Sequence, residues 1–224
     1  MSKLFRLYDC STKEYILPPA YEFIHGWGDD ILIANSNKVF ALYKNTGETL
    51  LSLDAGATEL PDYASLVNGV GKIVCEGLAG LINAQGEIVL ECRYEDVGNW
   101  SEGVAPAKKD GKWGFVAVNG DWKILPKYEG ADSFLNGYAA VKLDGKTALI
   151  NRSGETVAPF KYDGAGYVQN GRFPVAEIRN GKEFWGIADI DGTIILPIEY
   201  DTVEWIDLEL GRTRFHGKPA LGLQ

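Results

Sequence analysis

The chain has 224 residues, 46% of them hydrophobic and 24% charged, and its 31 acidic and 22 basic residues give a net charge of −9. This composition is typical of a globular protein and argues against extensive disorder. The acidic balance argues against a nucleic-acid partner, because binding to a phosphate backbone depends on Lys and Arg. With only two His, the chain has little material for a metal site, and we expect neither a metal nor a cofactor.

The amino terminus and the cysteines indicate the cellular compartment of the protein. Residues 1–7 lack the apolar core of a signal peptide. The chain contains no apolar run of about 18 residues, so we expect no membrane insertion. The three cysteines, Cys10, Cys75 and Cys92, are an odd number and form no Cys-x-x-Cys motif. This usage favours reduced, partly buried thiols and a cytoplasmic location.

A repeated pattern runs along most of the chain. Turn glycines recur at spacings of 39, 34, 34 and 38 residues: Gly47, Gly86, Gly120, Gly154 and Gly192. A tyrosine stands eight residues after four of them: Tyr94, Tyr128, Tyr162 and Tyr200. Because self-similarity at such a period is typical of repeat architectures, we interpret residues 1–224 as one repeat domain. Its units are roughly 26–58, 59–97, 98–131, 132–165 and 166–203, with partial units at 1–25 and 204–224.

Within a unit the apolar residues alternate with a period of two, which predicts strands. In residues 104–128, three apolar runs are separated by the turn pairs Asp110-Gly111 and Asn119-Gly120. Both pairs tolerate the positive φ angles that type I′ hairpin turns require. Each unit is therefore predicted to be a three-stranded antiparallel meander.

Two short motifs define the repeat in its clearest form. Trp113-Gly114-Phe115 follows Asp110-Gly111-Lys112, and the unit closes on Lys127-Tyr128. These residues resemble the WG (or KWG) repeat family. The resemblance is strongest over residues 98–205, where a second Trp-Gly pair occurs at Trp185-Gly186, and is weaker over 1–97. It implies an all-β protein of tandem repeats, of bacterial origin.

We predict an all-β fold of tandem three-stranded meanders that share a continuous core, because one meander cannot bury its apolar face alone. Pairing of the terminal units into a closed or nearly closed toroid would remove exposed sheet edges. An open, curved β-solenoid is the alternative. Between residues 57 and 71 we expect a short helix or a long loop.

The repeated aromatic and glycine residues are interpreted as structural. Glycine in a strand usually marks a close approach by another group, and a neighbouring aromatic ring can cover it. We therefore expect packing roles for the residues that define the repeat: Trp113, Gly114, Tyr128, Tyr162, Trp185, Gly186 and Tyr200.

No catalytic site is predicted. Neither His25 nor His216 belongs to a motif with a known mechanism, and we interpret both as structural. Acids such as Glu199 and Asp201 flank a repeated tyrosine, and related acids recur elsewhere: Glu129 and Asp163. A catalytic carboxylate pair should occur once. The recurrence instead favours turn acids that accept backbone N–H bonds.

Charge is unevenly distributed along the chain, and residues 183–211 contain eight acids and no base. If the two ends of the chain meet, these acids lie beside the acidic first half of the chain and form a negative face. Such a face attracts a basic partner and speeds association. A tryptophan within it could anchor the contact. The candidate partner-binding residues are Glu199, Asp201, Glu204, Trp205, Asp207 and Glu209.

The leading hypothesis is a non-enzymatic protein–protein interaction module. Its sharper form is an acidic inhibitor, such as an immunity protein that masks a basic toxin or nuclease. One alternative is carbohydrate or cell-envelope binding, which requires repeated aromatic rings exposed on one face. A second alternative is a hydrolase, which requires a deep pocket and a perturbed acidic pair outside the repeat consensus.

Overall fold

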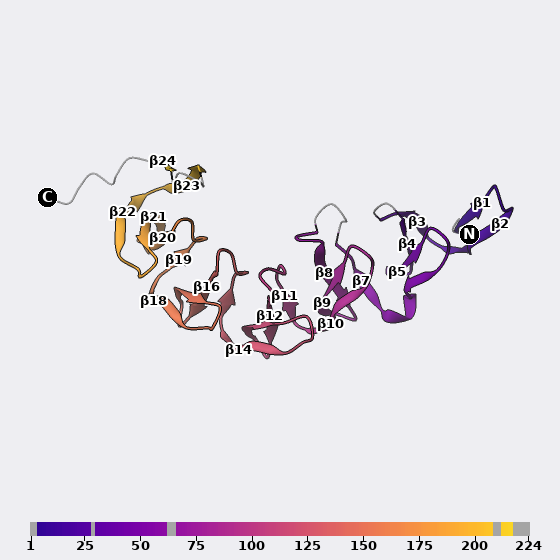
Figure 1. Cartoon of the computed structure of the whole chain (residues 1–224), viewed down its shortest axis with the longest axis horizontal. Coiled ribbons are helices and arrows are strands. Elements are labelled where there is room, and N and C mark those ends of the chain that lie inside the picture. Colours follow the sequence, from indigo (N-terminus) through magenta and orange to yellow (C-terminus); the bar gives the residue numbers. More distant parts are fainter. Residues whose placement is uncertain (1–3, 28–29, 62–65, 208–211, 217–224) are drawn as a thin grey trace. The chain divides into compact units, whose positions relative to one another are not determined.

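The computed structural model describes residues 4–27, 30–61, 66–207 and 212–216. Over these residues the protein consists of antiparallel β-sheets and one short 3₁₀ helix, η1 (Leu53–Ala55) (Figure 1). The all-β prediction is confirmed. By its internal contacts the chain divides into two compact units. Unit 1 comprises Met1–Trp100, Ala107–Lys109 and Val116–Asp121, and unit 2 comprises Ser101–Pro106, Asp110–Phe115 and Trp122–Gln224.

Unit 2 contains two four-stranded sheets with the same strand order, β15-β16-β17-β18 and β19-β20-β21-β22. The strands of the first sheet are β15 (Gly130–Ala131), β16 (Tyr138–Leu143), β17 (Lys146–Asn151) and β18 (Thr156–Tyr162). Those of the second are β19 (Gly164–Ala165), β20 (Arg172–Arg179), β21 (Lys182–Asp189) and β22 (Ile194–Tyr200). A two-stranded sheet follows, made of β23 (Thr202–Asp207) and β24 (Arg212–His216).

A third sheet has the same order, β11-β12-β13-β14. Its strands are β11 (Asp96–Val97), β12 (Ala105–Lys109), β13 (Lys112–Val116) and β14 (Trp122–Tyr128). In all three sheets the predicted meander forms the last three strands. The first strand has only two residues and directly follows the tyrosine that closes the preceding repeat. Because the chain enters the next sheet at once, each sheet has four strands, one more than predicted.

Unit 1 is less regular. Its large sheet has the order β10-β9-β8-β7-β5-β4-β3, with β6 also paired to β5, and β1 pairs with β2 in a separate sheet. The strands are β1 (Phe5–Asp9), β2 (Glu14–Tyr21), β3 (Phe23–Gly26), β4 (Ile31–Ser36), β5 (Val39–Lys44), β6 (Thr49–Leu51), β7 (Ala57–Glu59), β8 (Val70–Cys75), β9 (Leu78–Asn83) and β10 (Ile88–Tyr94). At the start of residues 57–71, where a helix or long loop was expected, β7 pairs with both β5 and β8 and joins two repeats into one sheet. Residues 62–65 of that segment lie outside the described residues.

The hairpin turns are of two kinds. At Asp144-Gly145 both residues have positive φ, 49° and 73°, as a type I′ turn requires. In the next hairpin of the same sheet only Gly154 has positive φ, its N–H donates to the carbonyl oxygen of Asn151, and the N–H of Asn151 donates to Glu155. This is the pattern of a type I turn closed by a glycine bulge. The turns predicted above behave alike. Asp110 and Gly111 both have positive φ, so the type I′ prediction is correct there, whereas at Asn119-Gly120 only Gly120 has positive φ and the prediction is wrong.

The strand glycines mark close backbone approaches. A Cβ atom on Gly114 would lie 2.5 Å from the carbonyl oxygen of Ile124, and one on Gly186 would lie 2.6 Å from that of Leu196. Between β21 and β22 the register shifts at this point, so the third strand of the meander bulges toward the glycine. The close approach that we expected at these glycines is thus made by backbone atoms of the neighbouring strand.

Consecutive repeats share their cores, as predicted. In unit 2 one cluster of buried residues joins Leu149 of β17 to Phe173 of β20 and Ile198 of β22, with Tyr162 between the two sheets. The preceding cluster joins Phe115 and Tyr128 to buried residues of the following sheet, which are Ala139, Val141 and Ile150. Each apolar face is therefore covered by the next repeat.

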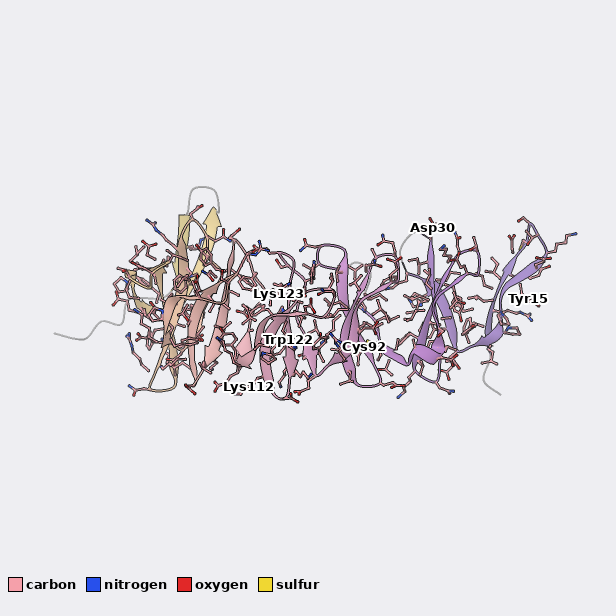
Figure 2. All side chains as sticks on the ribbon, turned by 60° about the horizontal axis from the view of Figure 1, so that its bottom comes forward. Tyr15, Asp30, Cys92, Lys112, Trp122 and Lys123 are labelled. Atoms are coloured by element: carbon pink, nitrogen blue, oxygen red, sulfur yellow. A yellow bond between two sulfur atoms is a disulfide. The ribbon has the colours of Figure 1, made fainter. Side chains whose placement is uncertain are left out.

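The expectation of three reduced cysteines is wrong for this structure. Cys75 of β8 and Cys92 of β10 form a disulfide, with their Cα atoms 5.7 Å apart, whereas Cys10 is free and exposed. Cys92 is labelled in Figure 2. The odd count suggested free thiols because it could not show that two strands of one sheet bring two of the three together.

Candidate functional site

The repeated tyrosines are buried between repeats. Tyr94, Tyr128 and Tyr162 are among the largest fully buried side chains, and Tyr200 is partly buried. The base before the tyrosine reaches the turn glycine of the following repeat. Arg93 donates to the carbonyl oxygen of Gly120 at 3.0 Å, and Lys161 donates to that of Gly192 at 2.8 Å. The three buried rings are therefore not free to stack on a sugar.

The acids after the tyrosine bind groups of the neighbouring hairpins. Asp163 accepts hydrogen bonds from the Lys146 ammonium at 2.6 Å and from the backbone N–H of Ile178 at 2.7 Å. Glu129 accepts a backbone N–H bond from Gly145 at 3.0 Å. These acids order turns and hairpins, which is the role their recurrence indicated.

The candidate partner-binding residues differ in exposure and in the residues that they face. Asp201 is exposed and forms an ion pair of 2.6 Å with Lys182, and Glu199 is partly buried. In the backbone register of β23 and β24, Glu204 lies opposite Arg214, Trp205 opposite Thr213, and Asp207 opposite Arg212. Two candidate acids thus stand at positions opposite arginines. Glu209 lies outside the described residues.

An aromatic cavity lies at the second sheet of unit 2. It has a volume of about 470 Å³, and its lining residues are Gly166, Tyr167, Gln169, Pro174, Trp185, Thr202 and Val203. The Tyr167 side chain is 51% exposed, whereas Trp185 is partly buried. The indole N–H of Trp185 donates to the Glu183 carboxylate at 3.0 Å, which fixes the ring at the wall of the cavity.

The aromatic cavity draws two of its lining residues, Trp185 and Thr202, from an acidic part of the sequence and the residue that follows it. Residues 183–201 contain five acids and no base: Glu183, Asp189, Asp191, Glu199 and Asp201. Of these only Asp201 is ion-paired in the described part of the chain. Asp189 and Asp191 accept backbone N–H bonds of their own turn. Residues 183–201 therefore carry a net negative charge.

The aromatic cavity was not predicted, although the sequence contains a signal for it. In the neighbouring repeats an aromatic residue stands three positions before a glycine, as Phe134 does before Gly137, and Phe134 is buried. Here Val168 takes that position and is only 3% exposed. Tyr167, one position earlier, is therefore turned out of the core.

One acid departs from the repeat pattern. Asp132 stands where the neighbouring repeats have Gly98 and Gly166, and desolvation by its surroundings raises the pKa of its carboxyl group. Asp132 lines neither cavity described for unit 2. Over the described ranges, no three His, Cys, Asp or Glu side chains gather as a metal site would require. No helix in these ranges is long and apolar enough to cross a membrane.

The repeat pattern matches a known family model. The model for the WG containing repeat matches residues 80–113, 113–146, 149–182 and 185–204, which together are more than half of the chain. The chain belongs to the WG-repeat family. The matched segments run from β9 to β23 and include both Trp-Gly pairs. No curated protein matches this WG-repeat chain.

Several solved structures resemble the WG-repeat chain at low identity. One is Hsv2 of Kluyveromyces lactis, for which one structure has a TM-score of 0.42 and 13% identity, covering 74% of this chain and 58% of that one. A second Hsv2 structure has a TM-score of 0.41 and 11% identity, covering 85% and 69%. PorZ, a surface component of the type-IX secretion system of Porphyromonas gingivalis, has a TM-score of 0.34 and 13% identity, covering 86% and 30%. The WG-repeat chain thus spans less than two thirds of the first of these Hsv2 structures.

Proposed function

We propose that this WG-repeat protein is a non-enzymatic interaction module that binds a basic protein partner through unit 2. The observation that supports the proposal is the aromatic cavity beside acidic side chains. Tyrosine and tryptophan are enriched among the residues that dominate binding energy at protein interfaces. Tyr167 is half-exposed in the unbound protein, and Trp185 is fixed by Glu183, so both rings are placed before a partner arrives.

The charge of this region indicates the kind of partner. A Lys or Arg side chain can lay its aliphatic stem on an aromatic ring and place its cationic head over the ring face. Glu183 then offers a carboxylate within the same site. Long-range attraction between the acidic surface and a basic partner raises the association rate, and salt screens that attraction.

The experiment is affinity capture from the native host, followed by kinetic measurement with the purified partner. We expect the association rate to fall at least about tenfold between low and high salt. We expect Tyr167→Ala and Glu183→Gln each to weaken binding by about tenfold or more, because they remove an anchor and a charge at the centre of the contact.

Tyr15→Ala is the matched control, because Tyr15 is a similarly exposed tyrosine of unit 1, labelled in Figure 2. This variant should bind as the wild type does. Binding that is insensitive to salt would contradict a basic partner. Equal binding of the wild type and Tyr167→Ala would contradict the site.

The sharper form of the proposal is an inhibitor of immunity type. A one-to-one complex that abolishes the activity of a basic toxin or nuclease would support it. An active complex would leave the protein a binding module of another kind and would contradict inhibition. Sequencing of the genes adjacent to the coding sequence would supply the first candidate partners.

A further inference from the structure

The charged side chains that line a second cavity of unit 2 are both positive, whereas the whole chain has a net negative charge. Its volume is about 310 Å³, and its lining residues are Gly103, Val104, Phe115, Lys123, Ile124, Phe134, Arg152 and Ser153. We call it the cationic cavity. Two cations and one hydroxyl line it, and no acid does.

The inner wall of the cationic cavity is apolar. Phe115 and Phe134 are buried, with their ring centroids 4.7 Å apart, and Ile124 is buried beside them. Lys123 and Arg152 are exposed, so the charges lie on the solvent side. A molecule that fills this cavity meets aromatic and aliphatic carbon inside and positive charge outside.

Both cations are departures from the repeat. Lys123 stands three residues after the turn glycine Gly120, where other repeats have apolar residues: Val89, Val157 and Ile195. Arg152 stands two residues before Gly154, where the other repeats have the uncharged residues Asn45, Ala84, Val118 and Ile190. The fold therefore requires neither cation, and yet the two meet in one cavity.

The donors of the cavity are available to a ligand. Arg152 donates one hydrogen bond to the backbone carbonyl oxygen of Glu102, which holds the guanidinium near Gly103. The other N–H groups of the guanidinium can donate to a ligand. Lys123, labelled on β14 in Figure 2, has no hydrogen-bond or ion-pair partner within the described ranges. The carboxylate of Glu102 accepts from the N–H of Gly137 at 3.1 Å and is not part of the lining.

We propose that the cationic cavity binds a small amphipathic anion, in which an apolar body carries a carboxylate or phosphate group. The apolar body occupies the space against Phe115 and Phe134. The oxyanion accepts hydrogen bonds from Arg152 and Lys123, which are charge-assisted and therefore stronger than neutral ones. A volume near 300 Å³ is at the small end of ligand sites, which limits the body to about one aromatic ring or a short alkyl chain. This site is separate from the one proposed for a protein partner.

The experiment is calorimetric titration of the full chain with three probes of similar shape. These are 3-phenylpropionate, phenyl phosphate and the neutral 3-phenylpropionamide. We expect at least one of the two anions to bind about tenfold or more tightly than the amide, because the amide has no negative charge to pair with the two cations and has one acceptor oxygen where the anions have two or more. The anion that binds more tightly identifies the oxyanion that the cavity prefers.

Two variants test the residues without disturbing the fold. Lys123→Val and Arg152→Val each introduce the kind of residue that other repeats carry, so thermal unfolding should change little. Each should weaken binding of the anion about tenfold and weaken binding of the amide much less, because the amide loses no ion pair. Lys109→Val, which removes an exposed lysine outside the cavity, is the matched control.

Three results would overturn the proposal. The first is equal affinity for the amide and both anions. The second is unchanged anion binding in both valine variants, or an equal loss in the Lys109→Val control. The third is binding of inorganic phosphate as tight as that of phenyl phosphate, which would show that the apolar wall contributes nothing.

Discussion

The hydroxyl group of Tyr162 donates a hydrogen bond of 2.8 Å to the backbone carbonyl oxygen of Gly192, the turn glycine of the following repeat. The Lys161 ammonium donates to the same oxygen at 2.8 Å and lies 4.9 Å from the centroid of the Tyr162 ring. One turn carbonyl thus receives two donors from the preceding repeat. This contact connects the tyrosine and the glycine that define the repeat in the sequence.

Tyr162→Phe should lower the free energy of unfolding by about 1 kcal/mol, the usual net value of one hydrogen bond. The loss is moderate because Lys161 still satisfies the Gly192 carbonyl. Urea unfolding followed by tryptophan fluorescence measures it. Tyr167→Phe is the control, because it removes a hydroxyl from a half-exposed ring and should change stability by less than about 0.5 kcal/mol. Equal stability of Tyr162→Phe and the wild type would contradict a stabilising contact.

Gly114→Ala should destabilise the protein by about 1–3 kcal/mol, the usual cost of overpacking a filled site. Its Cβ atom would lie 2.5 Å from the carbonyl oxygen of Ile124 and 2.7 Å from the nitrogen of Pro126, and neither backbone atom can move freely. Gly130→Ala is the control, because its nearest contact would be an ordinary 3.6 Å to Lys142. Thermal unfolding compares the two. A loss no greater for Gly114→Ala than for Gly130→Ala would show that the third strand adapts.

Asp163→Asn should lower the free energy of unfolding at neutral pH by about 1 kcal/mol. A buried charged hydrogen bond would contribute more, but Lys146 is half-exposed and solvent weakens the interaction. The bond from Lys146, and then that from the Ile178 N–H, hold the pKa of the Asp163 carboxyl below its usual 3.8. A carboxyl with a lower pKa in the folded state stabilises the protein above its unfolded pKa, and this contribution is lost as the pH falls through the folded value.

The difference between Asp163→Asn and the wild type should therefore be full near pH 7 and shrink below about pH 4. Denaturant unfolding at a series of pH values measures it. Asp144→Asn is the matched control, because asparagine suits the positive φ of this exposed turn residue. A difference independent of pH would exclude the carboxylate as its cause.

The parts of the fold that depend on local sequence pattern could be predicted. Alternation with a period of two and the turn pairs located the three strands of each meander, for example around Asp110-Gly111. The two-residue strand β19 could not be predicted, because Gly164 and Ala165 show no periodicity and become a strand only by pairing with β20. The same limit applies to β7, since one three-residue strand joins two repeats through tertiary pairing alone.

The candidate site could be predicted only in part. Counting acids located a negative segment, but it could not show that Lys182 pairs with Asp201. The opposition of Glu204 and Arg214 depends on the register of β23 and β24, which is set by hairpin geometry and not by composition. The sequence places Tyr167 four residues before Gly171, whereas neighbouring repeats have their aromatic residue three residues before the glycine. The exposure of Tyr167 follows from that one-residue offset.

The disulfide between Cys75 and Cys92 gives the last prediction. Alkylation of the unfolded, unreduced protein should modify Cys10 alone, and prior reduction should expose all three cysteines. Replacing both paired cysteines with serine should lower stability by about 3 kcal/mol, as expected for a bridge that closes a short loop. Mass spectrometry counts the modified thiols, and Cys10→Ser should leave stability unchanged.

The same alkylation on acid-quenched cells of the host tests the predicted cytoplasmic location, since the cytosol keeps most thiols reduced. A disulfide preserved in such cells favours an oxidising compartment and contradicts that prediction. Three alkylated cysteines without reductant, both in the purified protein and in cells, would instead contradict the bridge between β8 and β10. Because Cys75 and Cys92 both pack in the core of the large sheet of unit 1, the reduced pair would then behave as small apolar side chains.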